Sequence, residues 1–443
     1  MKQIRMRGAA ALLSLALTLP LMLPGWTARA AALEESGVAI SEETFPDAAF
    51  RSWLTDRNNL NGFGSDGYFS AAELAEIKSI DVSGKGIQTL EGIEQFSALE
   101  QLSCENNRLK ELDVKQNRAL RHLQCRFNQI AALDVSGLDN LISLNCESNH
   151  MKNLNLTGCT ALEIIYCRSN DLPEVDFSTN TSLKFIETFD NRLSSIDLSK
   201  LTALEFVHLD HNLLTHIDLS ANTNLSPIGS GFVARNNQLD TLTLPVKADL
   251  VVDPDVYAEQ DPKVGYERVE WYEDAEYHIP VTGPITANGQ TLYAKWLPND
   301  YTIRFNSNGG SGSMPEQSGV WDQKLTLEKN TFRRTGYAFQ GWKNVFGDDA
   351  FYDDGSEVLN LTGKYQGQRV TLYAQWEPIQ YTVAFDANGG QGEMAEESYR
   401  YDQSKNLPKC TMTGPDDKIF AGWATEWDGS VRYLDQSAVR NLA

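Results

Sequence analysis

The sequence predicts a mainly β protein, in which a solenoid of short stacked coils with a small α-helical N-terminal cap is followed by small β-rich modules. Two periodicities carry this prediction. A segment of 21 residues recurs seven times between residues 99 and 244, and a longer unit that begins at Tyr301 begins again at Tyr381. A chain of 443 residues that is 41% hydrophobic and 22% charged has ordinary globular composition and the length of about two to four domains.

One asparagine per copy marks the shorter repeat. The first two copies read LEQLSCENNRLKELDV from Leu99 and LRHLQCRFNQIAALDV from Leu120. The marker asparagines lie 21 residues apart until the last, which follows after 25 because of an insertion around residues 226–229. They are Asn107, Asn128, Asn149, Asn170, Asn191, Asn212 and Asn237. Since an amide both donates and accepts hydrogen bonds, we expect these side chains to form a structural ladder that satisfies backbone groups where each strand ends.

Each copy is too small to bury its own apolar side chains, so stacked copies have to build one continuous core. The L-x-C or L-x-L segment fits a strand, and successive strands would pair about 4.8 Å apart in a parallel sheet. The returning side, with triplets such as residues 112–114, is too short for a full helix and is expected to be extended or 3₁₀. The pattern L-x-x-L-x-C/L-x-x-N-x-L resembles the leucine-rich repeat in the short bacterial form of internalin-like surface proteins.

Four cysteines recur at the same inward position of successive copies, namely Cys104, Cys125, Cys146 and Cys167. A disulfide or a metal site is one interpretation of this stack. Later copies carry Thr188, Leu209 and Ala234 at the same position, which indicates that a small buried side chain is all that is required. Because zinc sites use closer cysteine pairs, the sequence predicts a core ladder with no metal and no cofactor. Cys159 and Cys410 have no evident disulfide partner in the sequence.

The N-terminus has the three parts of a secretory signal peptide, with cleavage expected after residue 30. A basic stretch, MKQIRMR, precedes an apolar run over residues 8–23 and a small-residue site at residues 28–30. A membrane anchor is the alternative, but Pro20 and Pro24 interrupt a run that is already shorter than the ~20 residues needed to span a bilayer. We therefore expect a secreted or cell-surface protein with no membrane insertion after signal cleavage.

Residues 31–98 are expected to form a cap that shields the first coil of the solenoid. Within the cap, GFGSDGYFSAAE resembles an EF-hand loop, with Asp66 at its fifth position and Glu73 at its twelfth. Gly62 and Gly64 stand where two oxygen ligands belong, so the loop is degenerate and a structural turn is the prediction. Asp66 and Glu73 are the weak metal-ligand candidates of the chain.

The longer repeat follows the solenoid. YTIRFNSNGG at Tyr301 returns as YTVAFDANGG at Tyr381, and TLYAKW over residues 291–296 returns as TLYAQW over residues 371–376. These phrases resemble the Listeria–Bacteroides repeat, the B-repeat module of internalins, and the resemblance implies small β-grasp-like α+β domains. In so small a domain, Trp342 is expected to fill the core, with stacking on a ligand as the alternative.

These patterns divide the chain into six segments. They are a signal peptide at 1–30, a cap with the EF-hand-like loop at 31–98, a seven-repeat solenoid at 99–245, a partial B-repeat-like module at 246–298, a B-repeat module at 299–377 and another at 378–443. The last copy stops before a third TLYAxW strand, so we expect a truncated module.

Charge and motifs narrow the function classes. The net charge of −22 disfavours nucleic acid and anionic membrane surfaces as partners. The sequence holds no nucleophile elbow, HExxH, phosphate loop or dinucleotide fingerprint, so we expect no enzyme. His208 and His211 would point to opposite faces of a strand and should not share a metal ion.

The outward positions of the strands carry the candidate binding site on the concave face. In three adjacent copies these positions change from polar to aromatic and charged, and the residues are Ile164, Tyr166, Arg168, Phe185, Glu187, Phe189, Phe206, His208 and Asp210. Aromatic side chains presented to water and flanked by charges are typical of protein-binding hot spots. Two alternatives remain: a loop folds over the rings, or the rings only stiffen the sheet as cross-strand pairs.

The sequence therefore predicts an exported, non-enzymatic recognition or adhesion protein whose solenoid binds a protein partner and whose B-repeat modules are spacers. The internalin-like resemblance implies the surface of a bacterium and a partner on a host or neighbouring cell. Two alternatives stay open, a glycan-binding surface protein and the targeting region of a longer enzyme.

Overall fold

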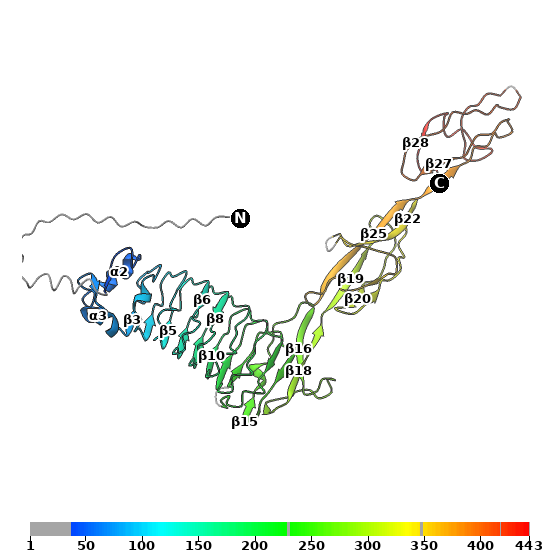
Figure 1. Cartoon of the computed structure of the whole chain (residues 1–443). Coiled ribbons are helices and arrows are strands. Elements are labelled where there is room, and N and C mark those ends of the chain that lie inside the picture. The colour runs from blue at the N-terminus through cyan, green and yellow to red at the C-terminus, as the bar shows by residue number, and fades with distance from the viewer. Residues whose placement is uncertain (1–36, 228–230, 346–348, 417, 443) are drawn as a thin grey trace, which may run out of the picture. The chain divides into compact units, whose positions relative to one another are not determined.

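The computed structural model describes residues 37–227, 231–345, 349–416 and 418–442, and the predicted signal peptide at 1–30 lies outside them. The chain forms two compact units (Figure 1). The N-terminal unit runs to Tyr257 and includes Gly283–Thr291, and the C-terminal unit holds Ala258–Thr282 and the chain from Leu292 onward.

The N-terminal cap consists of two short helices, α2 (Ala48–Leu54) and α3 (Ala71–Glu76), the 3₁₀ turn η1 (Leu60–Gly62), and an antiparallel pair of β1 (Val38–Ala39) and β2 (Tyr68–Phe69). Asp47 begins α2, because its carboxylate accepts hydrogen bonds from the backbone N–H groups of Ala49 and Phe50 at 2.9 and 3.0 Å. The predicted small helical cap is thus confirmed.

Four buried rings join the cap to the first coil. Phe45 packs against Phe50, Phe69 and Phe96, with ring centroids 5.7, 6.5 and 6.1 Å away, and all four rings are excluded from solvent. Since Phe96 follows η2 (Ile93–Gln95), the turn that leads into the first strand of the repeat, this cluster covers the open end of the solenoid.

An eight-stranded parallel sheet forms one side of the solenoid, with one strand from each coil in the order β13-β11-β10-β9-β7-β5-β4-β3. Its strands are β3 (Ser79–Asp81), β4 (Gln101–Ser103), β5 (His122–Gln124), β7 (Ser143–Asn145), β9 (Ile164–Tyr166), β10 (Phe185–Glu187), β11 (Phe206–His208) and β13 (Phe232–Val233). The register follows the repeat, so equivalent residues of successive coils form a row. Ser143 lies beside Ile164, Ile164 lies beside Phe185, and Phe185 lies beside Phe206. In this sheet the middle residue of each three-residue strand is buried, as its inward position requires.

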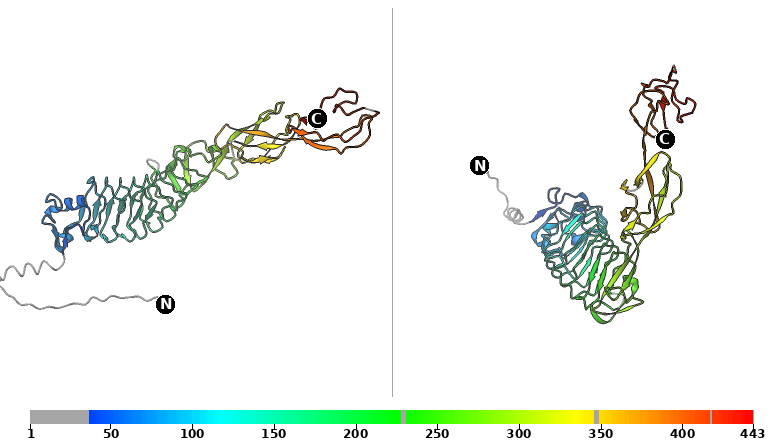
Figure 2. Two further views of the ribbon diagram at one scale, coloured as in Figure 1. Left: turned by 90° about the horizontal axis from the view of Figure 1, so that it is seen from above. Right: turned by 90° about the vertical axis from the view of Figure 1, so that its right-hand side faces the viewer.

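The returning side of the coils holds only short strands. β6 (Ala132–Asp134) pairs with β8 (Asn153–Asn155), and β12 (His216–Asp218) pairs with β14 (Thr241–Thr243), both in parallel. Figure 1 labels β6 and β8, and Figure 2 shows the stacked coils of the solenoid from two further sides. No helix occurs between residues 99 and 245 in the part of this segment that the structure describes. The predicted extended return is therefore confirmed.

A second asparagine column supports the turns of the returning side. Asn180 is fully buried, and its side-chain amide donates to the carbonyls of Leu156 and Cys159 in the preceding coil, both at 3.0 Å. Asn117 and Asn222 hold the same position in other coils, and each amide likewise donates to two carbonyls of the coil before it. Cys159 occupies this column in its own coil, where its thiol donates to the Val135 carbonyl at 3.1 Å. The thiol that has no disulfide partner thus replaces an asparagine amide.

The last coil is followed by a pair of antiparallel strands within the N-terminal unit. β15 (Val246–Val252) pairs antiparallel with β17 (Ile285–Asn288), with a register shift between Lys247 and Val251. The 3₁₀ turn η3 (Pro254–Val256) comes next, and the Val256 carbonyl accepts a hydrogen bond from the N–H of Ala234 at 2.8 Å. Residues 246–257 therefore continue the solenoid at its end.

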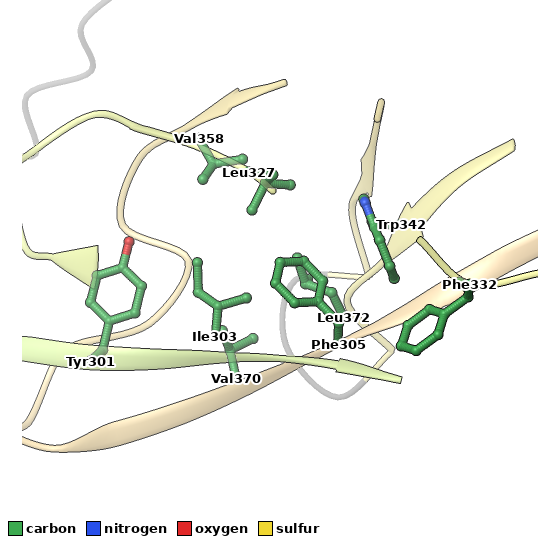
Figure 3. Close-up of a cluster of buried hydrophobic side chains, with 10 residues drawn as sticks. Tyr301, Ile303, Phe305, Leu327, Phe332, Trp342, Val358, Val370 and Leu372 are labelled. Carbon is green, nitrogen blue, oxygen red and sulfur yellow. The ribbon is translucent and has the colours of Figure 1, made fainter. Parts of the chain in front are cut away.

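The C-terminal unit starts with β16 (Tyr266–Tyr272), which pairs antiparallel with β18 (Thr291–Pro298). A five-stranded sheet follows in the order β20-β19-β25-β22-β23. Its strands are β19 (Asp300–Asn306), β20 (Gln317–Val320), β22 (Tyr337–Lys343), β23 (Phe351–Tyr352) and β25 (Gln368–Pro378). β21 (Leu325–Thr326) and β24 (Glu357–Val358) pair beside it. The core under this sheet gathers Tyr301, Ile303, Phe305 and Trp342 among its buried side chains (Figure 3), so Trp342 fills the core as expected.

The last module has two separate pairs, β26 (Gln380–Val383) with β27 (Glu397–Arg400) and β28 (Lys405–Asn406) with β29 (Ala438–Val439). No helix occurs in the described residues of either module, so the helical part of the expected α+β fold is wrong and the β-grasp resemblance is not confirmed. The reason lies in the pattern. In LTLEKNTFRRTG at 325–336 the buried Leu327 and Phe332 are five residues apart, a spacing that does not place both on one face of a helix.

Candidate functional site

The nine predicted binding residues lie together on the outward side of the sheet, over β9, β10 and β11. The register aligns Ile164, Phe185 and Phe206 in one row and Tyr166, Glu187 and His208 in the next. Arg168, Phe189 and Asp210 follow two residues beyond the strands. All are half-buried except Asp210, which is only 3% exposed.

The rings in this region contact one another across the strands. Phe185 stacks on Phe206, with centroids 4.6 Å apart and planes inclined by 17°, and Tyr166 lies 5.5 Å from Phe185 on the other side. Phe189 lies 4.4 Å from the imidazole of His208. We call Ile164, Tyr166, Phe185, Phe189 and Phe206 the aromatic patch. Phe206 covers one face of Phe185, so the rings pair across strands and also remain partly open to solvent.

A ladder of alternating charges runs beside the aromatic patch. Glu105, Arg126, Glu147 and Arg168 hold the same position in four successive coils. Arg126 contacts both Glu105 and Glu147, and Arg168 contacts Glu147. The Glu147 carboxylate, 2% exposed, lies 2.6 Å from Arg168 Nε and 3.4 Å from Arg126. Arg168 also reaches Glu187 at 3.2 Å and covers the Phe189 ring at 5.1 Å. The charges expected to meet a partner are thus paired within the chain.

Asp210 anchors the other border of the patch. Its carboxylate accepts hydrogen bonds from the Arg235 guanidinium at 2.8 Å and the Arg235 backbone N–H at 2.7 Å, and His208 Nε2 lies 3.1 Å away. Burial raises the pKa of the Asp210 carboxyl, but the hydrogen bonds from His208 and Arg235 outweigh burial and leave this pKa below its ordinary value. Asp210 is therefore an ionised structural support beside the rings.

The marker asparagines are bonded in one repeated pattern. In Asn149 the side-chain amide donates to the carbonyls of Cys125 and Cys146 at 3.1 and 3.2 Å, and its Oδ1 accepts from the Ile130 N–H at 3.1 Å. Each amide therefore joins its own strand end to that of the preceding coil. The same donor and acceptor pattern holds for Asn107, Asn128, Asn170, Asn191, Asn212 and Asn237.

Comparison with known families concerns the modules behind the solenoid. Residues 301–375 and 381–441 match the Listeria–Bacteroides repeat domain. The two modules that follow the solenoid are thus similar to this repeat domain. The match confirms the Listeria–Bacteroides resemblance that the sequence motifs of these modules indicate.

Three individual proteins are similar to parts of this chain. A putative membrane protein of Evansella cellulosilytica is 30% identical over 174 residues, which cover 38% of this chain and 24% of that protein. The internalin InlF of Listeria monocytogenes is 22% identical, and the match covers 47% of this chain and 61% of the InlF chain, with a TM-score of 0.41. Internalin C2 of the same species is 19% identical, and the match covers 46% of this chain and 90% of that protein's chain, with a TM-score of 0.39.

The cysteines of the leucine-rich repeats are free and buried. Burial raises the pKa of Cys125 and Cys167 to about 12 and raises the pKa of Cys104 and Cys146 well above its ordinary value. The thiols are therefore protonated core groups at neutral pH. The described ranges contain no group of three or more His, Cys, Asp or Glu side chains that could hold a metal ion.

The two weak metal-ligand candidates of the cap have structural partners. Glu73 Oε2 accepts hydrogen bonds from the backbone N–H and the hydroxyl of Ser70 at 2.7 and 2.8 Å, and Ser70 Oγ accepts from the Glu73 N–H at 3.2 Å. This reciprocal pair is the capping box of α3. Asp66 Oδ1 accepts from the Tyr68 N–H at 3.2 Å within the turn.

No helix in the described part of the chain is long and apolar enough to cross a bilayer.

The charge ladder makes a testable contribution to stability. Replacing Glu147 by alanine should lower the free energy of unfolding of the solenoid by about 1–3 kcal/mol, because two arginines lose a buried charged acceptor. Urea unfolding followed by circular dichroism measures this loss. The matched control is Glu163→Ala, which removes an exposed ion pair with Lys184 at 2.9 Å and should change stability by less than about 0.5 kcal/mol. Equal effects of the two substitutions would contradict the supporting role of Glu147.

Proposed function

We propose that the protein is an exported, non-enzymatic recognition protein that binds a protein partner through the aromatic patch on the concave face of its solenoid. The Listeria–Bacteroides repeats act as spacers behind this surface. The observation that carries the proposal is a continuous row of partly exposed rings whose charged neighbours are already paired inside the chain.

This pairing decides what the surface offers to a partner. Arg168 is shared between Glu147 and Glu187, and Asp210 is held by Arg235, so little unbalanced charge remains beside the rings. Binding energy would then come from burial of apolar ring edges and of Ile164, as at the hot spots of protein interfaces. A protein segment with apolar or aromatic side chains is the partner that suits this chemistry.

Ring geometry also favours a protein over a glycan. Sugars stack on open aromatic faces, whereas Phe185 and Phe206 cover one face of each other and Tyr166 lies 5.5 Å from Phe185 in tilted geometry. Its edge can still contact apolar side chains of a protein in edge-to-face geometry. Glycan binding therefore serves as a distinguishing arm of the test.

Peptide selection tests the proposed site directly. Random peptides displayed on phage are selected on the immobilised chain, and the enriched peptides are then titrated against variants. Replacing both Phe185 and Phe206 by serine should weaken binding about a hundredfold, because two hot-spot rings are lost. A glycan array probed with the same protein should show no binding that depends on these two rings.

The chain supplies a matched control for this test. Phe127 is 44% exposed on the same solenoid, and Ser148 and Ser169 hold its repeat position with the same positive φ of 53°. Phe127→Ser should therefore leave both stability and peptide binding unchanged. The double variant should also stay folded, since Ser143 is the natural residue in the row of Phe185. Unchanged peptide binding, or a collapse of the melting temperature that explains its loss, would show the patch to be structural only.

A further inference from the structure

Two junctions in the C-terminal unit repeat the same contact between different modules. At the first junction the Tyr266 hydroxyl donates to Asp322 Oδ2 at 2.6 Å. At the second junction the Tyr337 hydroxyl donates to Asp402 Oδ2, also at 2.6 Å. Each tyrosine follows a glycine, in GYERVEW and GYAFQGW, and each aspartate belongs to the module that comes next in the sequence.

The receiving aspartate is oriented by its own module. The Asp402 N–H donates to Asn441 Oδ1 at 2.6 Å, and the Asn441 amide donates back to Asp402 Oδ1 at 2.9 Å. Asn360 makes the same reciprocal pair with Asp322, at 2.7 and 2.8 Å. Both aspartates have a positive φ, 57° for Asp322 and 62° for Asp402. The carboxylate is thus fixed by groups other than the tyrosine that it binds.

An aromatic ring packs on the glycine that precedes each tyrosine. A Cβ at Gly265 would lie 2.2 Å from the ring of Trp321, and a Cβ at Gly336 would lie 2.3 Å from the ring of Tyr401. Only glycine allows this approach, and the φ values of 91° and 78° also favour it. Each ring comes directly before the aspartate, so glycine and tyrosine are contacted together.

The linker residue is hydrogen-bonded to both sides. Ile379 N–H donates to the Gly336 carbonyl at 2.9 Å, and the Ile379 carbonyl accepts from Tyr401 N–H at 3.0 Å. Asn299 bridges Gly265 and Trp321 in the same way, at 2.7 and 2.9 Å. The chain between modules is therefore part of the interface.

We propose that these residues form a docking interface in which the Gly-Tyr turn of one module is recognised by the aromatic-Asp pair and the asparagine of its successor. The partner of each such surface is the Gly-Tyr turn of the preceding module. This inference does not depend on the proposed recognition function. It implies that successive modules are held together by specific contacts and are not connected by flexible linkers alone. In the last module Lys418 stands five residues before Trp423, where Tyr337 stands before Trp342, so that module presents no such turn.

Electrostatics agrees with this geometry. Hydrogen bonds from Asn441 and Tyr337 lower the pKa of the Asp402 carboxyl to about 2. The hydrogen bond to Asp402 in turn raises the pKa of the Tyr337 phenol above its ordinary value. The pair therefore stays in its bonding form, ionised acid and neutral phenol, across neutral pH.

Amide hydrogen exchange on the full chain tests the interface. In Tyr337→Phe and in Asp402→Asn, the amides of Ile379 and Tyr401 should exchange on the order of tenfold faster, while the amide of Ile303 in the module core keeps its rate. A second readout is the Tyr337 phenol pKa, which should fall toward its ordinary value in Asp402→Asn. Tyr365→Phe is the control, because Tyr365 is 72% exposed and is not among the residues of the second junction.

Each outcome decides the proposal. Faster exchange confined to Ile379 and Tyr401, with the control unchanged, supports a docking interface. Unchanged exchange in both variants overturns it, because the contact would then not hold the junction closed. Faster exchange throughout the module in both variants also overturns it, since the tyrosine and aspartate would then serve module folding instead.

Discussion

Replacing Asn149 by alanine should lower the free energy of unfolding of the solenoid by about 2–4 kcal/mol. The buried amide donates to carbonyls of two successive coils and accepts from the Ile130 N–H. Alanine leaves these backbone groups without partners at a place where the side chain is only 5% exposed and water cannot replace the amide freely. Urea unfolding followed by circular dichroism measures the loss.

The position of Asn149 in the middle of the stack enlarges the effect. In a solenoid each coil is stabilised by its contacts with its two neighbours, so a weakened interface separates the coils on either side. We therefore expect a broader unfolding transition as well as a lower midpoint. Asn140→Ala is the control, because Asn140 is exposed and its amide donates only to the Arg118 carbonyl and to the carboxylate of its exposed neighbour Asp139. If Asn149→Ala were as mild as Asn140→Ala, the amide column would not be a main support of the fold.

The solenoid could be predicted because its information is local and periodic. One copy of 21 residues specifies an inward leucine, an inward small residue and an asparagine, and stacking repeats the same environment for each. The burial of Cys125 and Cys146 follows from this period alone, since the later Thr188 and Ala234 show what the position tolerates. The same period placed Ile164, Phe185 and Phe206 in one row.

The charge ladder was missed although its signal is present in the sequence. Glu105, Arg126, Glu147 and Arg168 alternate in sign at intervals of 21 residues, and residues at this interval become lateral neighbours in the sheet. Within a single copy, Arg168 has no acidic residue at the equivalent position to pair with and is therefore predicted to contact a partner. The equivalent position of the preceding copy holds Glu147, and opposite charges on adjacent strands attract.

The module junctions could not be predicted, since each contact joins residues of two different modules and the repeat does not show which residues of neighbouring modules meet. Tyr337 and Asp402 are 65 residues apart, and their contact depends on how one module ends and the next begins. The absence of a helix from the described residues of the two modules could not be predicted from the resemblance either. The β-grasp-like expectation came from family resemblance, whereas Leu327 and Phe332 fit extended chain that crosses the core.

Replacing Trp342 by alanine should lower the free energy of unfolding of its module by about 3–5 kcal/mol, the largest single loss expected in the C-terminal unit. The ring is fully buried and lies 4.8 Å from Phe305 and 5.0 Å from Phe339. Alanine leaves a cavity that the short strands around it cannot close. Differential scanning calorimetry of the full chain should show a lower transition for this unit and an unchanged one for the solenoid.

Two further variants separate packing from other effects. Trp427→Ala removes a tryptophan that is 83% exposed in the last module, and it should change the free energy of unfolding by less than about 0.5 kcal/mol. Trp342→Phe keeps most of the ring and removes an indole N–H that has no hydrogen-bond partner among the described residues. It should therefore cost clearly less than alanine, because the smaller cavity is offset by the loss of an unsatisfied buried donor. Equal losses for phenylalanine and alanine would contradict this account, because they would mean that the volume of the side chain at position 342 does not set the stability of the core.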